Sequence, residues 1–136
     1  LVLRVALGRS ASIKVFGTDY PTADGTCLRD YVHTEDLASA HLLAIEATTP
    51  GTAEVYNIGT GQGTTVREII DACERVTGTK IAQEFTDRRP GDPTALVADP
   101  AKLKRQLGWV PKYTSTDDII ATAWAWHQAY PDGYAK

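Results

Sequence analysis

The feature that most constrains the fold is the alternation of short strand-like segments with helical segments. "ASIKVFG" and "KIAQEF" are short, apolar and rich in β-branched or aromatic residues, which is typical of strands. Between them, residues 66–77 repeat apolar side chains at helical spacing; Thr65 and Glu68 precede the repeat with capping-box spacing, and Gly78 closes it. The alternation predicts a layered α/β or α+β domain.

The same signals set the other expected elements. The segment 18–33 is rich in turn residues at first and then extended. Thr34 is the expected N-cap of one helix, and Asp99 the expected N-cap of another that has Pro100 in its first turn. Helices are expected at residues 1–7, 35–47, 100–107 and 116–129, and strands at residues 11–17, 53–59, 80–85 and 95–99.

Composition excludes some partners and locations. The net charge of −3 argues against nucleic acid or an anionic membrane as a partner, because both favour a basic face. No apolar run approaches the roughly 20 residues that a membrane-spanning helix needs. Cys27 and Cys73 lie far apart without metal-site spacing, so we expect free thiols and a reducing, cytoplasmic location.

The start of the chain predicts a fragment. The sequence contains no methionine, and Leu1 falls inside an apolar, helix-like run. We therefore expect the chain to be one part of a longer protein.

A glycine-rich stretch between a strand and a helix is predicted to be a structural turn. Gly59, Gly61 and Gly63 suggest a dinucleotide loop, whose backbone amides would face a pyrophosphate. The spacing G-x-G-x-x-G would need a glycine at position 64, where the chain has Thr64. A turn that leads into the helix is the favoured interpretation.

The stretch "FTDRRPGDPTAL" combines adjacent arginines with a stiff turn. The Pro-Gly pair restricts the backbone, so the flanking side chains of Arg88, Arg89 and Asp92 lose little further freedom on binding. Guanidinium groups match phosphate oxygens in a bidentate way, and a carboxylate suits a sugar hydroxyl. The residue types indicate a nucleoside diphosphate site, and a solvated loop with a surface ion pair is the alternative.

A second arginine lies in the extended segment before residue 34. Arg29 and Tyr31 would share one face, with Asp30 on the other. Taken alone, Arg29 and Asp30 are more typical of a structural ion pair. His33 and His41 are predicted to be packed or surface histidines, since no acid or nucleophile has helpful spacing.

Taken together, these stretches resemble the UDP-glucose 4-epimerase family of the extended short-chain dehydrogenases/reductases. The resemblance runs nearly end to end, through "IKVFGTDYPTADGTCLRDYVHTEDLASAH", "EVYNIGTGQGTTVREII", "RRPGDP" and "LVADPAKLKRQLGWVPKYTSTDDIIATAWAWHQ". It implies that residues 1–136 are the C-terminal UDP-sugar-binding part of such an enzyme. The expected fold is a small mixed α/β sheet with flanking helices, without the N-terminal Rossmann half.

The resemblance also implies a role for particular residues. Arg29 and Arg89 match the arginines that hold the diphosphate of UDP, and Asp92 matches the acceptor for the ribose hydroxyls. The backbone at Lys14 and Phe16 matches the edge that contacts uracil.

Three more positions carry a less definite expectation. Tyr31 matches a tyrosine near the nucleotide, and Leu96 matches a residue close to the hexose. Arg88 is expected to support the loop or face solvent.

In this family a tightly bound NAD takes hydride from C4 of the sugar and returns it to the other face. The implied ligands are UDP-glucose and UDP-galactose, and the implied assembly is a homodimer. The family's G-x-x-G-x-x-G loop and Tyr-x-x-x-Lys pair are missing from these residues, so the chain alone is expected to be inactive. Two alternatives stay open: an epimerase for another UDP-sugar (a pentose, uronate or N-acetylhexosamine), or a non-catalytic nucleotide-sugar-binding domain.

Overall fold

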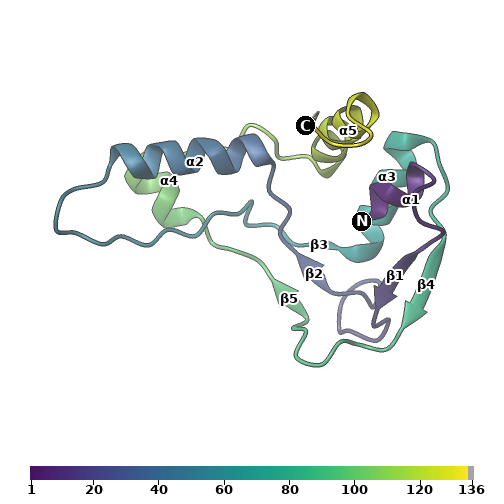
Figure 1. The fold of residues 1–136 in the computed structure, drawn as a ribbon. Helices are drawn as coiled ribbons and strands as arrows, with labels where there is room; N and C mark the ends of the chain where they lie inside the picture. Colours follow the sequence, from purple (N-terminus) through teal and green to yellow (C-terminus); the bar gives the residue numbers. More distant parts are fainter. Residues whose placement is uncertain (135–136) are drawn as a thin grey trace.

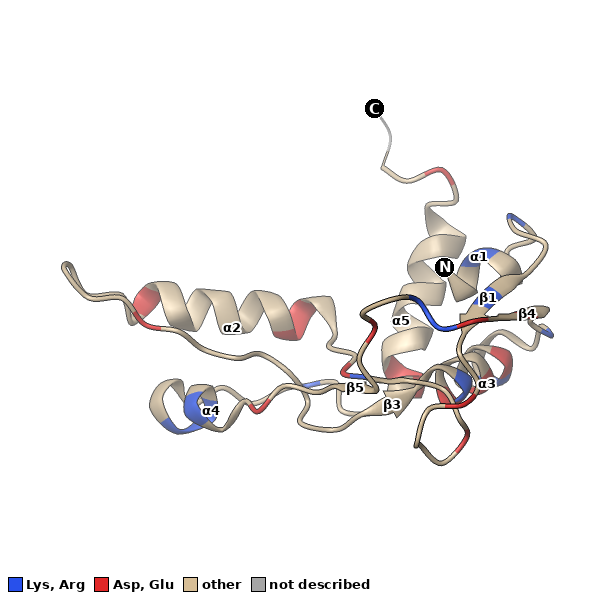
Figure 2. Cartoon of the chain, turned by 90° about the horizontal axis from the view of Figure 1, so that it is seen from below, with Lys and Arg blue, Asp and Glu red and all other residues tan. Residues whose placement is uncertain are grey.

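The computed structural model describes residues 1–134, which form an elongated molecule with two ends (Figure 1). The helices and strands of the described residues are α1 (Val2–Ala6), β1 (Ile13–Phe16), β2 (Leu28–Arg29), α2 (Thr34–Glu46), β3 (Thr64–Thr65), α3 (Val66–Thr77), β4 (Gln83–Thr86), β5 (Ala95–Leu96), α4 (Ala101–Leu107) and α5 (Thr116–Ala129). Helices α2 and α4 lie together at one end, and α1, α3 and α5 lie at the other with β1 and β4 (Figure 1 and Figure 2). The short strands β3, β2 and β5 lie between them. The expected small α/β fold with flanking helices is confirmed.

The core at the first end lies between one parallel strand pair and two helices. β1 and β4 run parallel, with Val15 opposite Phe85. The side chain of Val15 is fully buried, and so is that of Ile70 on α3. Val5 on α1 and Ile81 just before β4 complete this cluster. The packing fixes β1 against α1 and α3, and β1 forms one wall of the candidate site.

A second sheet joins three strands of only two residues each. β2 is antiparallel to β3 and parallel to β5. Arg29 therefore pairs with Thr64 on one side and with Leu96 on the other. So few ladder bonds make a weak sheet, because strands of five or six residues are usual. Side-chain contacts must therefore help to hold these strands in place.

At the other end, Trp109 joins α2 to α4. Its ring is buried among Ala40, Leu103 and partly buried neighbours, and its Nε1–H donates to the Asp36 carbonyl and to Ser39 Oγ at 3.1 Å each. The Asp36 carboxylate is also buried and accepts bonds from two backbone N–H groups, at 2.7 and 3.0 Å. Trp109 of the "LGW" sequence (residues 107–109) thus has a structural role, because it packs α2 against α4.

Several predicted helix ends are confirmed. The Thr65 hydroxyl accepts from the Glu68 N–H, and the Glu68 carboxylate accepts from the Thr65 N–H, which makes the expected capping box. Gly78 ends α3 with φ of 67°, a left-handed conformation that glycine adopts without steric cost. Helix α5 spans the predicted 116–129.

Other expectations about elements are wrong. The N-cap of α2 is His33 and not Thr34, because His33 Nδ1 accepts from the Glu35 N–H at 3.0 Å. The ring of His33 also stacks on Tyr113, at 3.7 Å between centroids, so a distant segment decides where the helix begins.

The expected buried strand at residues 53–59 is not a strand in the structure. Val55 in this segment is 77% exposed, and no other described segment pairs with it. The expected strand at residues 95–99 is only β5. Among the described residues, no helix has the length and apolar character to span a bilayer.

Candidate functional site

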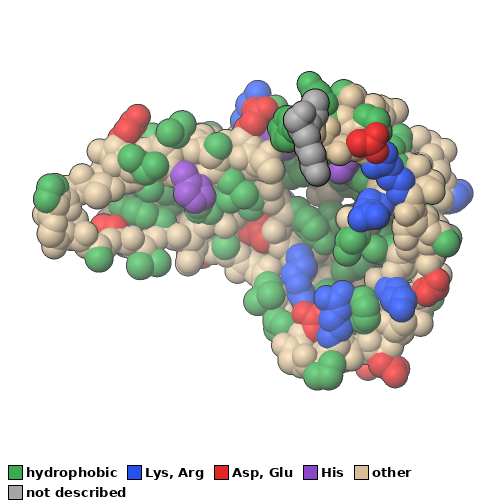
Figure 3. Space-filling view, viewed as in Figure 1, with side chains coloured by type: hydrophobic (Ala, Val, Ile, Leu, Met, Phe, Trp, Pro, Cys, Tyr) green, Lys and Arg blue, Asp and Glu red, His purple; other side chains and the backbone are tan. Residues whose placement is uncertain are grey.

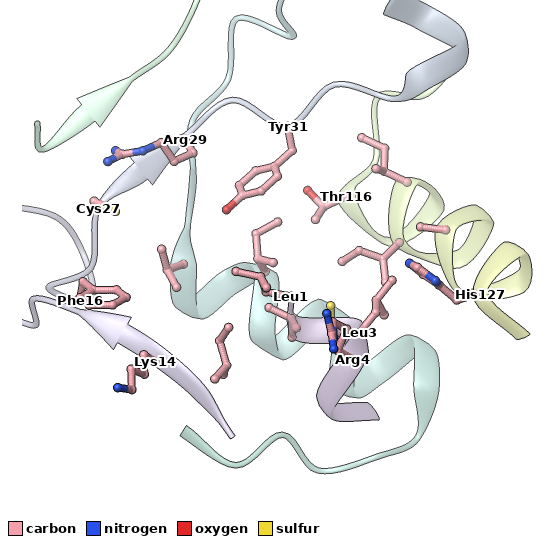
Figure 4. A pocket seen from close by; sticks show the side chains of 18 of the residues that line it. Leu1, Leu3, Arg4, Lys14, Phe16, Cys27, Arg29, Tyr31, Thr116 and His127 are labelled. Atoms are coloured by element: carbon pink, nitrogen blue, oxygen red, sulfur yellow. The ribbon is translucent and has the colours of Figure 1, made fainter. Parts of the chain in front are cut away.

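A cavity of about 470 Å³ opens between β1, the end of β2, the loop after β4 and the helices α1, α3 and α5. Figure 3 shows Lys and Arg side chains gathered around this hollow, with hydrophobic side chains deeper inside. Figure 4 shows Tyr31 pointing into the cavity, with Arg29 and Phe16 on one side and His127 of α5 on the other. The cavity therefore has a cationic rim at one end and an apolar wall at the other.

Arg29 is held by the loop that precedes β5. Its Nη2 donates to Asp92 Oδ1 at 2.5 Å, and its Nη1 donates to the Pro93 carbonyl at 3.1 Å. Both charged side chains are 22% exposed, so solvent screens the pair only in part. The partner of Arg29 is thus Asp92, and the expected ion pair between Arg29 and Asp30 is wrong.

The segment Arg89-Pro90-Gly91-Asp92 forms a tight turn. The Asp92 N–H donates to the Arg89 carbonyl at 3.1 Å, and Gly91 has φ of 80°. Proline in the second position and a left-handed glycine in the third are typical of a type II turn. The turn brings the side chains of Arg89 and Asp92 to the same cavity.

The two adjacent arginines have different surroundings. Arg88 turns away from the cavity: its Nε donates to Asp19 Oδ1 at 2.7 Å, and its guanidinium lies 4.0 Å above the Tyr20 ring. The hydrogen bond from Arg88 lowers the pKa of Asp19. Arg89 lines the cavity, with its guanidinium carbon 3.8 Å above the centre of the Phe16 ring. Arg88 thus attaches the loop to the neighbouring segment, which leaves Arg89 at the cavity.

Strand β1 presents backbone groups toward the cavity side. The N–H groups of Ile13 and Gly17 donate across to the segment of β4. Backbone groups alternate in direction along a strand, so those of Lys14 and Phe16 face the opposite, open edge. Both residues line the cavity, which leaves peptide donors and acceptors available to a ligand.

Tyr31 and two cysteines form part of the cavity wall. Tyr31 lies two residues after Arg29 and on the same side, as the extended segment predicted, and burial raises its pKa. Cys27 and Cys73 are both free and buried, and burial raises the pKa of the Cys73 thiol to about 11. Leu96, by contrast, is 54% exposed on β5 and is not among the residues that line the cavity.

The glycine-rich stretch does not face the cavity. Its amides at Thr60 and Gly61 donate to the carboxylate of Asp30, on the side of β2 opposite Arg29. The predicted structural turn is therefore confirmed. No group of His, Cys, Asp and Glu suited to a metal ion occurs within residues 1–134.

Nothing in the sequence indicated that α1 and α5 form part of the cavity wall. Leu1 and Leu3 of the N-terminal segment and Ile119, Ala123 and His127 of α5 line the cavity. The sequence predicted a helix over residues 116–129, but it did not show that one side of this helix faces a cavity. Contacts between helices more than 110 residues apart leave no signal in a single sequence.

The chain is similar to known nucleotide-sugar enzymes. Residues 2–122 match the model of a family described as GDP-mannose 4,6 dehydratase. A UDP-glucose 4-epimerase from Halalkalibacterium halodurans is 46% identical over 136 residues, covering 99% of this chain and 41% of that protein. A probable UDP-arabinose 4-epimerase from Oryza sativa subsp. japonica is 44% identical over 131 residues, covering 96% of this chain and 32% of that protein.

A solved structure of such an enzyme has a similar fold over the matched residues. The crystal structure of UDP-glucose 4-epimerase from Bifidobacterium longum, in complex with NAD+ and UDP, superposes with a TM-score of 0.91. The two sequences are 40% identical, and the match covers 98% of this chain and 39% of that chain. The chain thus spans about two fifths of the length of this structure.

Proposed function

Because the chain belongs to the GDP-mannose 4,6 dehydratase family and is an extended short-chain dehydrogenase/reductase of the UDP-glucose 4-epimerase type, we propose that its cavity binds the UDP part of a UDP-sugar. One observation carries the proposal. Arg29 and Arg89, sixty positions apart in the sequence, line one cavity together with Asp92 and Phe16.

In the proposed complex the two guanidinium groups bind the diphosphate. Arginine forks donate to phosphate oxygens in pairs, and the partly buried setting of Arg29 strengthens such bonds. The carboxylate of Asp92 accepts a ribose hydroxyl while it keeps its pair with Arg29, because an ionised carboxylate has about four acceptor sites.

The open edge of β1 fits a base. The backbone groups of Lys14 and Phe16 can pair with the polar edge of uracil, as peptide groups do in a sheet. Tyr31 then lies beside the nucleotide, and Leu96 lies toward the sugar. Both assignments rest on the resemblance; Tyr31 also lines the cavity, whereas Leu96 does not.

For the whole protein we propose interconversion of UDP-glucose and UDP-galactose with a tightly bound NAD, as a cytoplasmic homodimer in galactose metabolism. When bound, NAD supplies the hydride acceptor for C4 of the sugar. The glycine-rich stretch of this chain does not fit NAD, because Asp30 already takes its amides at Thr60 and Gly61. The cofactor and the catalytic groups are therefore assigned to residues outside these 136, which form the C-terminal UDP-sugar-binding domain.

Titration calorimetry with the whole protein tests the proposal. UDP should bind, uridine should bind more weakly because it lacks the diphosphate, and ADP should bind more weakly because its base does not fit the β1 edge. Equal affinity for UDP and ADP would contradict the assignment of the base site. Incubating the whole protein with UDP-glucose and UDP-arabinose, and identifying the products, then determines the sugar.

A further inference from the structure

Asp30 directly follows β2, and its carboxylate accepts four hydrogen bonds. Oδ1 accepts from the Thr60 N–H at 2.9 Å and from the Thr60 hydroxyl at 2.6 Å. Oδ2 accepts from the N–H groups of Gly61 and Ala98, each at 3.2 Å. Four donors saturate an ionised carboxylate, so the group acts as a fixed anchor.

The anchored segments are the two neighbours of β2. Thr60 and Gly61 lie in the turn that leads to β3, and Ala98 lies two residues after β5. Strands of two residues provide few backbone bonds of their own. The carboxylate of Asp30 therefore supplies contacts that a longer ladder would make, and it does so on both sides of β2.

The glycine-rich stretch is shaped around this carboxylate. A side chain at Gly59 would meet the Asp30 carboxylate, and it would approach the Cβ of Ala98 to 2.6 Å. Successive backbone N–H groups in such a turn form a concave site that attracts anions. Here the anion is a side chain of the same protein.

The register of β2 against β5 decides where the guanidinium of Arg29 lies. Its acceptors, the Asp92 carboxylate and the Pro93 carbonyl, belong to the segment that enters β5. Asp30 holds the far end of the same strand through Ala98. Because side chains alternate along a strand, Asp30 anchors from one face while Arg29 lines the cavity on the other.

We propose that Asp30 is a positioning residue that holds Arg29 in place for the diphosphate of the nucleotide. This inference rests on the proposed function. It predicts that loss of the Asp30 carboxylate harms recognition of the diphosphate and spares recognition of the base.

The variant Asp30→Asn keeps the size of the side chain but turns one acceptor into an N–H donor that faces other N–H groups. Calorimetry with UDP and with uridine compares the two ligands. The affinity for UDP should fall by about tenfold or more, because the guanidinium of Arg29 is no longer aligned for its hydrogen bonds to the diphosphate. Uridine affinity should change by less than about twofold. Asp36→Asn is a matched control, because Asp36 is also a carboxylate that accepts backbone N–H groups but lies away from the cavity. It should leave the affinities for both UDP and uridine unchanged.

Equal weakening of UDP and uridine by Asp30→Asn, or no change in either, would overturn the proposal. If that variant does not fold, Thr60→Ala removes only the hydroxyl donor and should weaken UDP alone by about threefold. If the wild type binds no UDP, the proposed function fails. The NMR chemical shift of the Arg29 Nε–H resonance still tests whether Asp30 positions Arg29. That resonance should shift in Asp30→Asn, or in Thr60→Ala if only this variant folds, but not in Asp36→Asn; an unchanged position refutes the inference.

Discussion

Replacing Arg89 and Arg88 separately by alanine tests whether two adjacent arginines have different roles. Arg89 lines the cavity and stacks on Phe16, whereas Arg88 contacts Asp19 and Tyr20 outside it. We expect Arg89→Ala to weaken UDP binding strongly and Arg88→Ala to weaken it slightly. The pair is an internal control, because both variants lose the same charge at neighbouring positions.

The magnitude follows from the contacts. A hydrogen bond to a charged group contributes about 1.5–3 kcal/mol, so losing the guanidinium of Arg89 should raise the Kd for UDP about tenfold to about a hundredfold. Arg88 and Asp19 form an exposed pair, with side chains 40% and 75% accessible. Such pairs contribute little, so Arg88→Ala should raise the Kd by less than about threefold through a looser loop.

Titration calorimetry of the variants, made in the whole protein, measures both constants at pH 7.5, and circular dichroism checks that each variant is folded. Arg75→Ala serves as a remote control, since Arg75 pairs with Asp117 away from the cavity and should leave UDP affinity unchanged. If Arg88→Ala weakens UDP as much as Arg89→Ala does, the division of roles between the two arginines is refuted.

Three further outcomes are expected. Burial raises the pKa of Asp24, but hydrogen bonds from Thr65 and Thr26 outweigh burial and leave the pKa below its ordinary value. Asp24 therefore adds stability above about pH 4 that is lost as pH falls, so thermal denaturation between about pH 5 and about pH 3 should show a larger drop in Tm for the wild type than for Asp24→Asn. Because burial raises the pKa of Cys73 to about 11, iodoacetamide at pH 8 should leave this thiol unmodified in the folded chain and alkylate it in urea, as mass spectrometry would show; labelling of the folded chain would contradict the burial. Trp109→Phe removes a buried N–H donor with two acceptors and some packing volume, and urea denaturation should show a loss of about 2 kcal/mol; a loss within error would mean that the indole N–H contributes nothing.

Where structure depends on residues a few positions apart, it could be predicted from the sequence. Thr65 and Glu68 cap α3 as their spacing predicts, and Gly78 ends it. The turn from Arg89 to Asp92 likewise follows from a Pro-Gly pair. The capping box of α3 and the turn from Arg89 to Asp92 use only neighbouring residues, so the sequence carries their full signal.

The candidate site was predicted only in part. The residue types around Arg89 indicated a phosphate site, and the resemblance pointed to Arg29 as its second arginine. The partner of Arg29 was predicted wrongly: the adjacent Asp30 was preferred, whereas the structure pairs it with Asp92 across 63 positions. Such pairing depends on which strands become neighbours. Because β2 has only two residues, its sequence does not indicate which strands pair with it.

By itself, the sequence determined the helices, the capping box and the closing glycine of α3, the stiff arginine turn and the absence of a dinucleotide fingerprint. Only the tertiary structure decided that Arg88 faces Asp19 while Arg89 lines the cavity. It also decided that His33 begins α2 and that the Asp30 carboxylate accepts backbone N–H groups of the glycine-rich turn. The reason is the range of the interactions: caps and turns form within four residues, whereas ion pairs, ring stacking and strand register join segments that only packing brings together.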